Sequence, residues 1–264
     1  MRSTSNPAFR NLPVGGGGYA GFNSAPVGFP GAAPGYAGAP PIVGRPMTID
    51  DVVTKTGITL AILIATGAAT YFTPGIWGLA LPAALIGFVL ALVIVFKKVV
   101  SPPLILVYAA VEGVFLGGIS GVIGTAVGNP GIVFQAIAGT ALVFGGMLVV
   151  YKTGAVKVTP RFTKWLIGAM IGVVGLMLIN LIAGFFVDGG LGLRDGGPLA
   201  ILFSLVCIGI AAFSFLLDFD AADEAIRAGA PEKTAWYIAF GLTVTLVWLY
   251  LEILRLLSYF QGGD

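Results

Sequence analysis

The chain has 264 residues, of which 57% are hydrophobic and only 10% are charged, with a net charge of +2. Because soluble globular domains carry roughly 25% charged residues, this composition excludes an ordinary soluble protein and predicts an integral membrane protein. The single cysteine, Cys207, excludes disulfide and cysteine-zinc frameworks, and the lack of histidine excludes Ser-His hydrolases, His-Glu-x-x-His metalloproteases and His-ligated haem.

The first region, residues 1–46, is rich in glycine and proline and contains no acidic residue. Its aromatic side chains follow no helical or strand period. Such a segment cannot bury enough apolar surface to offset the entropy lost on ordering, so we predict a disordered cytoplasmic tail. It lacks the early apolar core of a signal peptide. A docking role for the tail aromatics stays open, and no protein partner can be named.

Seven apolar segments, bounded by proline, glycine and charge, follow in residues 47–264. Each reaches or approaches the roughly 20 residues that cross a bilayer core, and a chain in lipid must satisfy its backbone groups within the segment, so we expect helices. The fold class predicted is therefore an all-α bundle of seven transmembrane helices. The segments are 56–72, 76–96, 104–127, 132–151, 162–187, 199–217 and 235–260.

Lysine and arginine predict the orientation of the bundle. If the tail and the connections after the second, fourth and sixth segments share one side, that side holds every Lys and Arg except Arg194 and Arg255. Cytoplasmic loops carry the excess of basic residues. We therefore expect the N-terminus in the cytoplasm and the C-terminus outside.

Glycines recur at short spacing in the third, fourth and fifth segments, as in GVFLGGISGVIG, GTALVFGG and GAMIGVVGLM. Small residues at such spacing let helix backbones approach closely in lipid. They predict tight packing of these three helices. A nucleotide-binding loop is disfavoured because none of these runs follows a strand.

Four carboxylates lie within or at the end of apolar segments. Glu112 is in the third, Asp218 and Asp220 close the sixth, and Glu252 is in the seventh. An ionised group at membrane depth costs on the order of 3 kcal/mol or more, so these acids are the candidate functional residues. With no histidine in the chain, a pH response would depend on them. Glu112 has no basic residue one turn away, so it must be protonated, paired across helices or hydrated.

The acids of the last two segments have competing interpretations. Asp218 and Asp220 point about 160° apart on a helix, so only one can face the bundle interior. Glu252 can form a structural salt bridge with Arg255, three residues on. That pairing is the alternative to a functional role.

Depth decides whether Asp218 and Glu252 can meet. Straight antiparallel helices would separate them by about 18 Å. Residues 232–240, however, include Trp236 and the neighbouring tyrosine, which favour the headgroup level. If this piece lies along the interface and the helix turns inward near Gly241, the two carboxylates become level. We then expect them to share a proton, because two like charges cannot both ionise in a low-dielectric site.

The sequence resembles the transmembrane Bax inhibitor motif superfamily in its bacterial branch. The resemblance lies in YAAVEGVFLGGIS, LLDFD and LYLEILRLL, while MTIDDVVTKTGITL and the opening MRSTSNPAFRNLP are similar to actinobacterial members. It implies seven helices with the last one central, in a bacterial plasma membrane. It also implies a pH-dependent calcium leak governed by carboxylates on the sixth and seventh helices.

Carried over to this chain, the resemblance assigns the seventh-helix role to Glu252, where the family more often has Asp. It assigns the sixth-helix role to Asp218 or Asp220. It implies no tight metal site but transient Ca²⁺ at Asp218 and Glu252. The family's basic latch on an early helix has no counterpart in the second segment, which leaves Lys55 as the candidate.

The function predicted is a pH-sensitive cation leak whose partners are the bilayer, calcium and protons, without a cofactor or nucleic acid. A proton-coupled transporter of a small solute would use the same acids, but broken helices or inverted repeats are expected of it. A regulatory membrane protein without transport activity is a further alternative. An enzyme is disfavoured. The class that two acids on adjacent helices would suggest, an intramembrane aspartyl protease, needs a Gly-x-Gly-Asp motif within the membrane, and no apolar segment contains one; the only Gly-Gly-Asp is residues 262–264.

Overall fold

The computed structural model describes residues 45–97, 100–187 and 189–262. Within these ranges, seven helical spans are long and apolar enough to cross a membrane, which confirms the predicted class. The second span consists of the 3-10 helix η2 and α2 together. The elements are α1 (Ile49–Tyr71), η2 (Pro74–Leu79), α2 (Ala80–Lys97), α3 (Pro102–Ala126), α4 (Gly131–Thr153), α5 (Pro160–Ala183), α6 (Pro198–Arg227) and α7 (Thr234–Gln261).

Local chemistry sets the ends of the helices. A capping box of Thr48 and Asp51 starts α1, and because it satisfies two free backbone N–H groups, the helix begins seven residues before the predicted apolar segment. Prolines at the first turn start α3, α5 and α6. Gly154, with φ of 67°, ends α4. The sixth helix continues to Arg227, ten residues beyond the apolar run, so the acidic stretch is helical.

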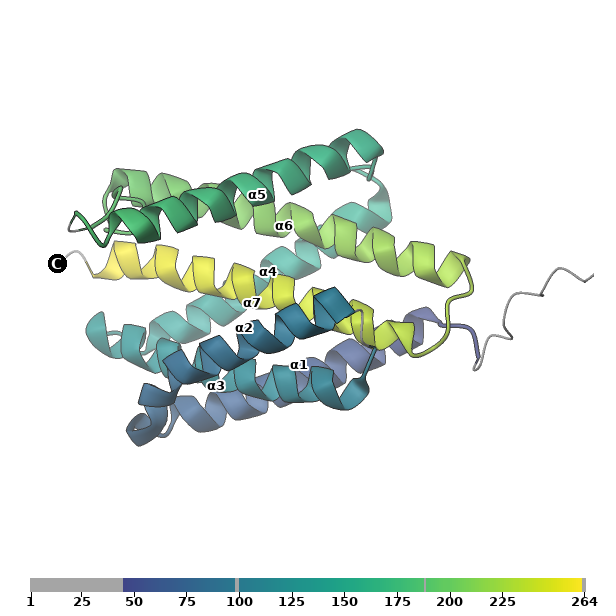
Figure 1. Ribbon diagram of the computed structural model, residues 1–264, viewed down its shortest axis with the longest axis horizontal. Coiled ribbons are helices and arrows are strands. Elements are labelled where there is room, and N and C mark those ends of the chain that lie inside the picture. The colour runs from purple at the N-terminus through teal and green to yellow at the C-terminus, as the bar shows by residue number, and fades with distance from the viewer. Residues whose placement is uncertain (1–44, 98–99, 188, 263–264) are drawn as a thin grey trace, which may run out of the picture. The chain divides into compact units, whose positions relative to one another are not determined.

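The last helix lies in the centre of the bundle, as predicted. Helix α7 packs against α1, α3, α4 and α6, and Figure 1 shows it between α5 and α6 on one side and α1, α2 and α3 on the other. We call the end with the α6–α7 connection (228–233) the loop end and the opposite end, where α7 finishes, the C-terminal end.

Helix α7 is continuous over its 28 residues, so the predicted turn near Gly241 is wrong. Trp236 and Tyr237 are half-buried and pack beside Phe240 against α2 and α3, where Tyr108 lies. Their burial keeps this first part of α7 in the bundle. A break would also leave backbone groups unsatisfied in lipid.

Close packing holds α1 against α3, as the glycines of the third segment predicted. A Cβ at Gly113 would overlap the carbonyl of Leu63, and one at Gly117 the carbonyl of Gly67. For α4 and α5 the same prediction is wrong at several positions: the space around Gly145 and its neighbour is open, as it is along one face of α5. Helix α5 packs against α6 alone within the described residues.

The segment before α1 is tied to the loop end. Pro46 and Pro231 form an isolated antiparallel bridge, and the amide of Met47 donates to Ala230 at 2.8 Å. The predicted tail lies outside the described residues over 1–44. Its last two residues, Arg45 and Pro46, are bound to the α6–α7 connection, because the Glu232 amide also donates to the Arg45 carbonyl at 3.0 Å.

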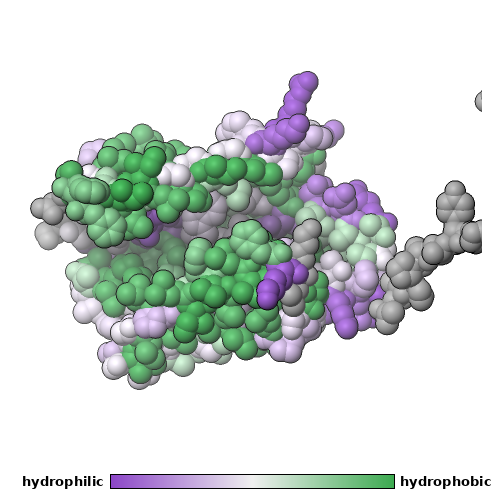
Figure 2. Space-filling view, in the orientation of Figure 1, coloured by the Kyte–Doolittle hydropathy of each residue, from purple (hydrophilic) through white to green (hydrophobic). Residues whose placement is uncertain are grey.

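The outer surface suits a bilayer. Large apolar side chains are exposed on every span, among them Leu81, Leu142, Ile171 and Leu181. Figure 2 shows apolar residues over most of this face, with hydrophilic residues gathered toward the loop end. The helices thus present lipid-compatible surface, while the polar side chains of interest lie between them.

Candidate functional site: acids within the helical bundle

The first acid, Asp218, faces α7 from the loop-end half of α6. Its Oδ2 accepts a hydrogen bond from Thr245 Oγ1 at 2.7 Å, and Gly241 lies directly opposite, since a Cβ there would be 3.8 Å from Oδ1. Asp218 is half-buried. Within the described residues, no lysine or arginine forms an ion pair with it. The carboxyl is therefore held by a hydroxyl and not by a cation.

The helix rotation separates Asp218 from Asp220. Among the described residues Asp220 has no side-chain hydrogen bond, whereas Asp223, further along α6, accepts one from Tyr151 of α4 at 2.8 Å. Of the two aspartates, Asp218 is thus the one whose side chain contacts α7.

The second acid, Glu252, lies near the C-terminal end of α7 and is only 2% exposed. Its Oε1 accepts from Arg255 Nη1 at 2.8 Å, the contact that the i+3 spacing allows, and lies 3.4 Å from Arg194 Nη2. Arg194 comes from the connection between α5 and α6. Two guanidinium groups therefore share one buried carboxylate, which we call the arginine clamp (Glu252, Arg194 and Arg255).

The arginine clamp places two cationic side chains on one carboxyl group. Burial, and next the neighbouring Arg255 charge, lower the pKa of Arg194 from its ordinary value, yet a guanidinium stays protonated under all ordinary conditions. Glu252 Oε2 is buried without a hydrogen-bond partner among the described residues. The three side chains together carry a net positive charge.

The structure does not bring Asp218 and Glu252 together. Thr245, the partner of Asp218, and Glu252 are seven residues apart on one unbroken helix, which corresponds to roughly 10 Å of rise. The expected shared proton required a turn near Gly241, and that turn does not exist. Each acid has its own partners at its own depth.

The third acid, Glu112, lies on α3 and is 8% exposed. Its Oε1 packs against α2, because a Cβ at Gly87 would approach it to 2.7 Å. Its Oε2 is buried with no hydrogen-bond partner among the described residues. No ion pair of the described chain includes Glu112.

Two contacts between α3 and α7 fix the depth of Glu112. Tyr108 packs on Phe240 with ring centroids 5.0 Å apart, and Ser120 is hydrogen-bonded to Tyr250 at 2.7 Å. Because both helices run in the same direction, Glu112 lies level with α7 residues 242–244. This is also the depth at which Asp218 meets α7.

Lys55 is placed elsewhere. Its Nζ lies 3.1 Å from Glu232 Oε1 and 4.0 Å from Asp51, with Trp236 beneath it at 5.9 Å. Lys55 therefore ties α1 to the α6–α7 connection at the loop end. It forms no ion pair with any of the four candidate acids.

Sequence reasoning missed Arg194 and Thr245. Arg194 is 58 residues from Glu252. It is, however, one of only two basic residues predicted for the outer side, which could have suggested a partner for a buried acid. Thr245 carries no sequence pattern that distinguishes it from other threonines in α7. In the described part of the chain, no three His, Cys, Asp or Glu side chains are grouped so that they could hold a metal ion.

The unbroken helices and their enclosed acids define a multi-pass membrane protein with ionisable groups inside its bundle. The family model described as Bax inhibitor 1 like matches residues 6–262. The chain therefore belongs to this family, and the predicted membership of the Bax inhibitor superfamily is confirmed. No curated protein matches the sequence.

Proposed function

We propose that this protein is a pH-sensitive cation leak of the membrane, with calcium as a permeant ion. The observation that carries the proposal is the placement of Asp218, against α7, and Glu112, against α2, at one depth in the bundle, without an ion pair to a basic residue among the described residues. An acid at membrane depth that lacks a cationic partner is typically part of an ion or proton path.

The surroundings of Asp218 suit a hard cation in transit. The carboxylate, the Thr245 hydroxyl and the nearby Gly241 carbonyl are oxygen groups, the kind of ligand that Ca²⁺ prefers. Ca²⁺ takes 6–8 such ligands when tightly bound, so this small set would hold the ion briefly. Protonation of Asp218 would remove the negative charge and close the path.

The arginine clamp supports a closed state at the C-terminal end. Its net positive charge would repel a cation that approaches Glu252. Opening would require the guanidinium groups of Arg194 and Arg255 to leave the carboxylate. The two halves of the bundle would then have different tasks, with proton sensing at Asp218 and Glu112 and exclusion at Glu252.

The same proposal includes the orientation and the membrane. The loop end carries Lys55, Arg45 and Lys152 and would face the cytoplasm, and the C-terminal end would face outward across a bacterial plasma membrane. A proton-coupled transporter receives no specific support, since α3, α6 and α7 are unbroken within the described residues.

Calcium flux into dye-loaded proteoliposomes, scanned from about pH 5 to about pH 8, tests the proposal. Wild type should conduct more than empty liposomes, and its pH dependence should weaken in Asp218→Asn and Glu112→Gln. Asp220→Asn is the matched control, because it makes the same change on α6 away from α7. Flux equal to that of empty liposomes at every pH would refute the leak and favour a regulatory role.

A further inference from the structure

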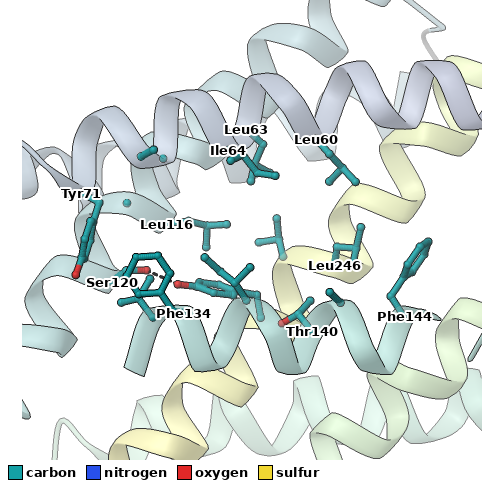
Figure 3. A pocket seen from close by; sticks show the side chains of 18 of the residues that line it. Leu60, Leu63, Ile64, Tyr71, Leu116, Ser120, Phe134, Thr140, Phe144 and Leu246 are labelled. Atoms are coloured by element: carbon teal, nitrogen blue, oxygen red, sulfur yellow. Dashed lines mark hydrogen bonds between the residues drawn. The ribbon is translucent and has the colours of Figure 1, made fainter. Parts of the chain in front are cut away.

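A lateral groove separates α1 from α4 in the half of the bundle near its C-terminal end. Within the described residues the backbones of these two helices do not approach each other closely; α3 and α7 form the floor between them. The groove encloses about 330 Å³. Figure 3 shows Leu60, Leu63 and Ile64 of α1 on one side, and Phe134 and Phe144 of α4 on the other.

Both ends of the groove are closed by side chains. Toward the C-terminal end, Tyr71 donates its hydroxyl to the Pro130 carbonyl at 3.4 Å. Toward the middle of the bundle stands Phe144, which packs edge-on against Phe215 of α6 at 5.2 Å. Ile64 and Phe134 on the two rims are each 63% exposed. The groove therefore opens sideways, where a membrane-spanning chain meets lipid.

The lining of the groove presents almost no polar surface to water. Its hydroxyl groups already have partners: Ser120 with Tyr250 at 2.7 Å, and Thr140 with the Ala136 carbonyl at 2.8 Å. The remaining lining is apolar. A cavity of this kind stays dry, and if it were empty its walls would lose their dispersion contacts. The occupant that suits it is an alkyl chain from the bilayer.

The length of the groove matches one leaflet. It extends along α1 from Leu60 to Tyr71, a rise of about 16 Å, and half of a hydrocarbon core of about 30 Å is about 15 Å. An acyl chain whose headgroup lies near Tyr71 would therefore reach Phe144 at the bilayer midplane. A detached water-soluble ligand would have no polar group to bind.

We propose that this groove is a specific site for one acyl chain of a membrane phospholipid. The chain lies between α1 and α4 and packs on α7 at Leu246, Val247 and Tyr250. It supplies lateral contacts between α1 and α4 along the length over which their backbones stay apart. The site is distinct from the acids and does not depend on ion conduction.

Photolabelling with a phospholipid that carries a diazirine midway along one acyl chain tests the site. The full-length protein is labelled in vesicles, and the modified peptides are mapped by mass spectrometry. Labels should concentrate on the facing surfaces of α1 and α4 and be sparse on α2 and α5. Filling the groove with Ala141→Phe should reduce labelling there roughly tenfold, a change of about 1.4 kcal/mol in affinity.

Ala138→Phe is the matched control, since it adds the same ring to an exposed position of α4 that does not line the groove. It should label like wild type. Ala68→Leu, which narrows the groove from α1, provides a second test if Ala141→Phe does not fold. Equal groove labelling in wild type and both filled variants, or labels spread evenly over α2 and α5, would overturn the site.

Discussion

The α6–α7 pair holds one acid in each half of the bundle, and the two acids have partners of different chemical kinds. Asp218 is held by the hydroxyl of Thr245 at 2.7 Å, whereas Glu252 is held between Arg255 and Arg194. A hydroxyl can donate to a carboxylate or accept from a carboxylic acid, so Asp218 can change its protonation without losing its partner. Guanidinium groups only donate, so Arg255 and Arg194 hold Glu252 through its acceptor oxygen alone.

An acid in a membrane helix therefore does not by itself predict a proton switch. What matters is the chemical class of its partner. A hydroxyl partner can serve both protonation states of an acid, whereas a permanently charged partner favours the anion. Glu112, which has no basic partner among the described residues, belongs with Asp218 in this respect.

The largest loss in the free energy of unfolding is expected from Glu252→Gln. The change leaves two guanidinium groups without their counter-ion inside the bundle, and removal of one member of a buried pair costs about 3–5 kcal/mol. Denaturant unfolding in detergent micelles measures this loss. Glu224→Gln, at an exposed position of α6, is the control and should stay within about 0.5 kcal/mol of wild type. Equal stability of the two variants would contradict the clamp.

A smaller effect is expected from Thr245→Val, which keeps the shape of the side chain but removes the donor to Asp218. An unsatisfied buried acceptor costs about 1–2 kcal/mol, measured by the same unfolding experiment. Thr243→Val is the matched control, because that hydroxyl donates only to the Ala239 carbonyl of its own helix. A loss no larger than that of the control would show that the Asp218–Thr245 bond does not matter.

Asp218→Asn should barely change stability, by less than about 1 kcal/mol, because the amide oxygen can still accept from Thr245. It should instead flatten the pH dependence of calcium flux, since the group that titrates is gone. Proteoliposome flux together with unfolding separates the two effects. If the pH profile of Asp218→Asn matches that of wild type while the flux persists, the sensor is elsewhere, and Glu112→Gln becomes the decisive variant.

The smallest effect is expected from Glu232→Gln at the loop end. Glu232 lies 3.3 Å from Arg45 and 3.1 Å from Lys55, but its side chain is 39% exposed. Ion pairs at such positions contribute about 1 kcal/mol or less and weaken as salt rises. Unfolding at low and high salt measures both. A loss as large as that of Glu252→Gln would remove the distinction between the exposed ion pairs and the buried clamp.

Hydropathy along the chain determined much of the architecture. The seven spans, their order and the four acids within apolar segments follow from local composition, since a bilayer imposes the same length and polarity limits on every helix. The i+3 spacing of Glu252 and Arg255 also placed that contact within reach. The ends were less accurate: α1 and α6 extend beyond their apolar runs because capping and polar contacts continue the helices.

Only the tertiary structure decided which groups the acids meet. The rotation of α6 turned Asp218 toward α7, and Arg194 reached Glu252 from a connection 58 residues away. The burial of Trp236 and Tyr237 against α2 and α3 kept α7 straight and the two carboxylates apart. The lateral groove likewise depends on α1, which packs closely on α3 at Gly113 and Gly117 while its backbone stays apart from that of α4. The physical reason is that hydropathy is a property of each segment, whereas a side chain's partner depends on the rotation and neighbours of its helix.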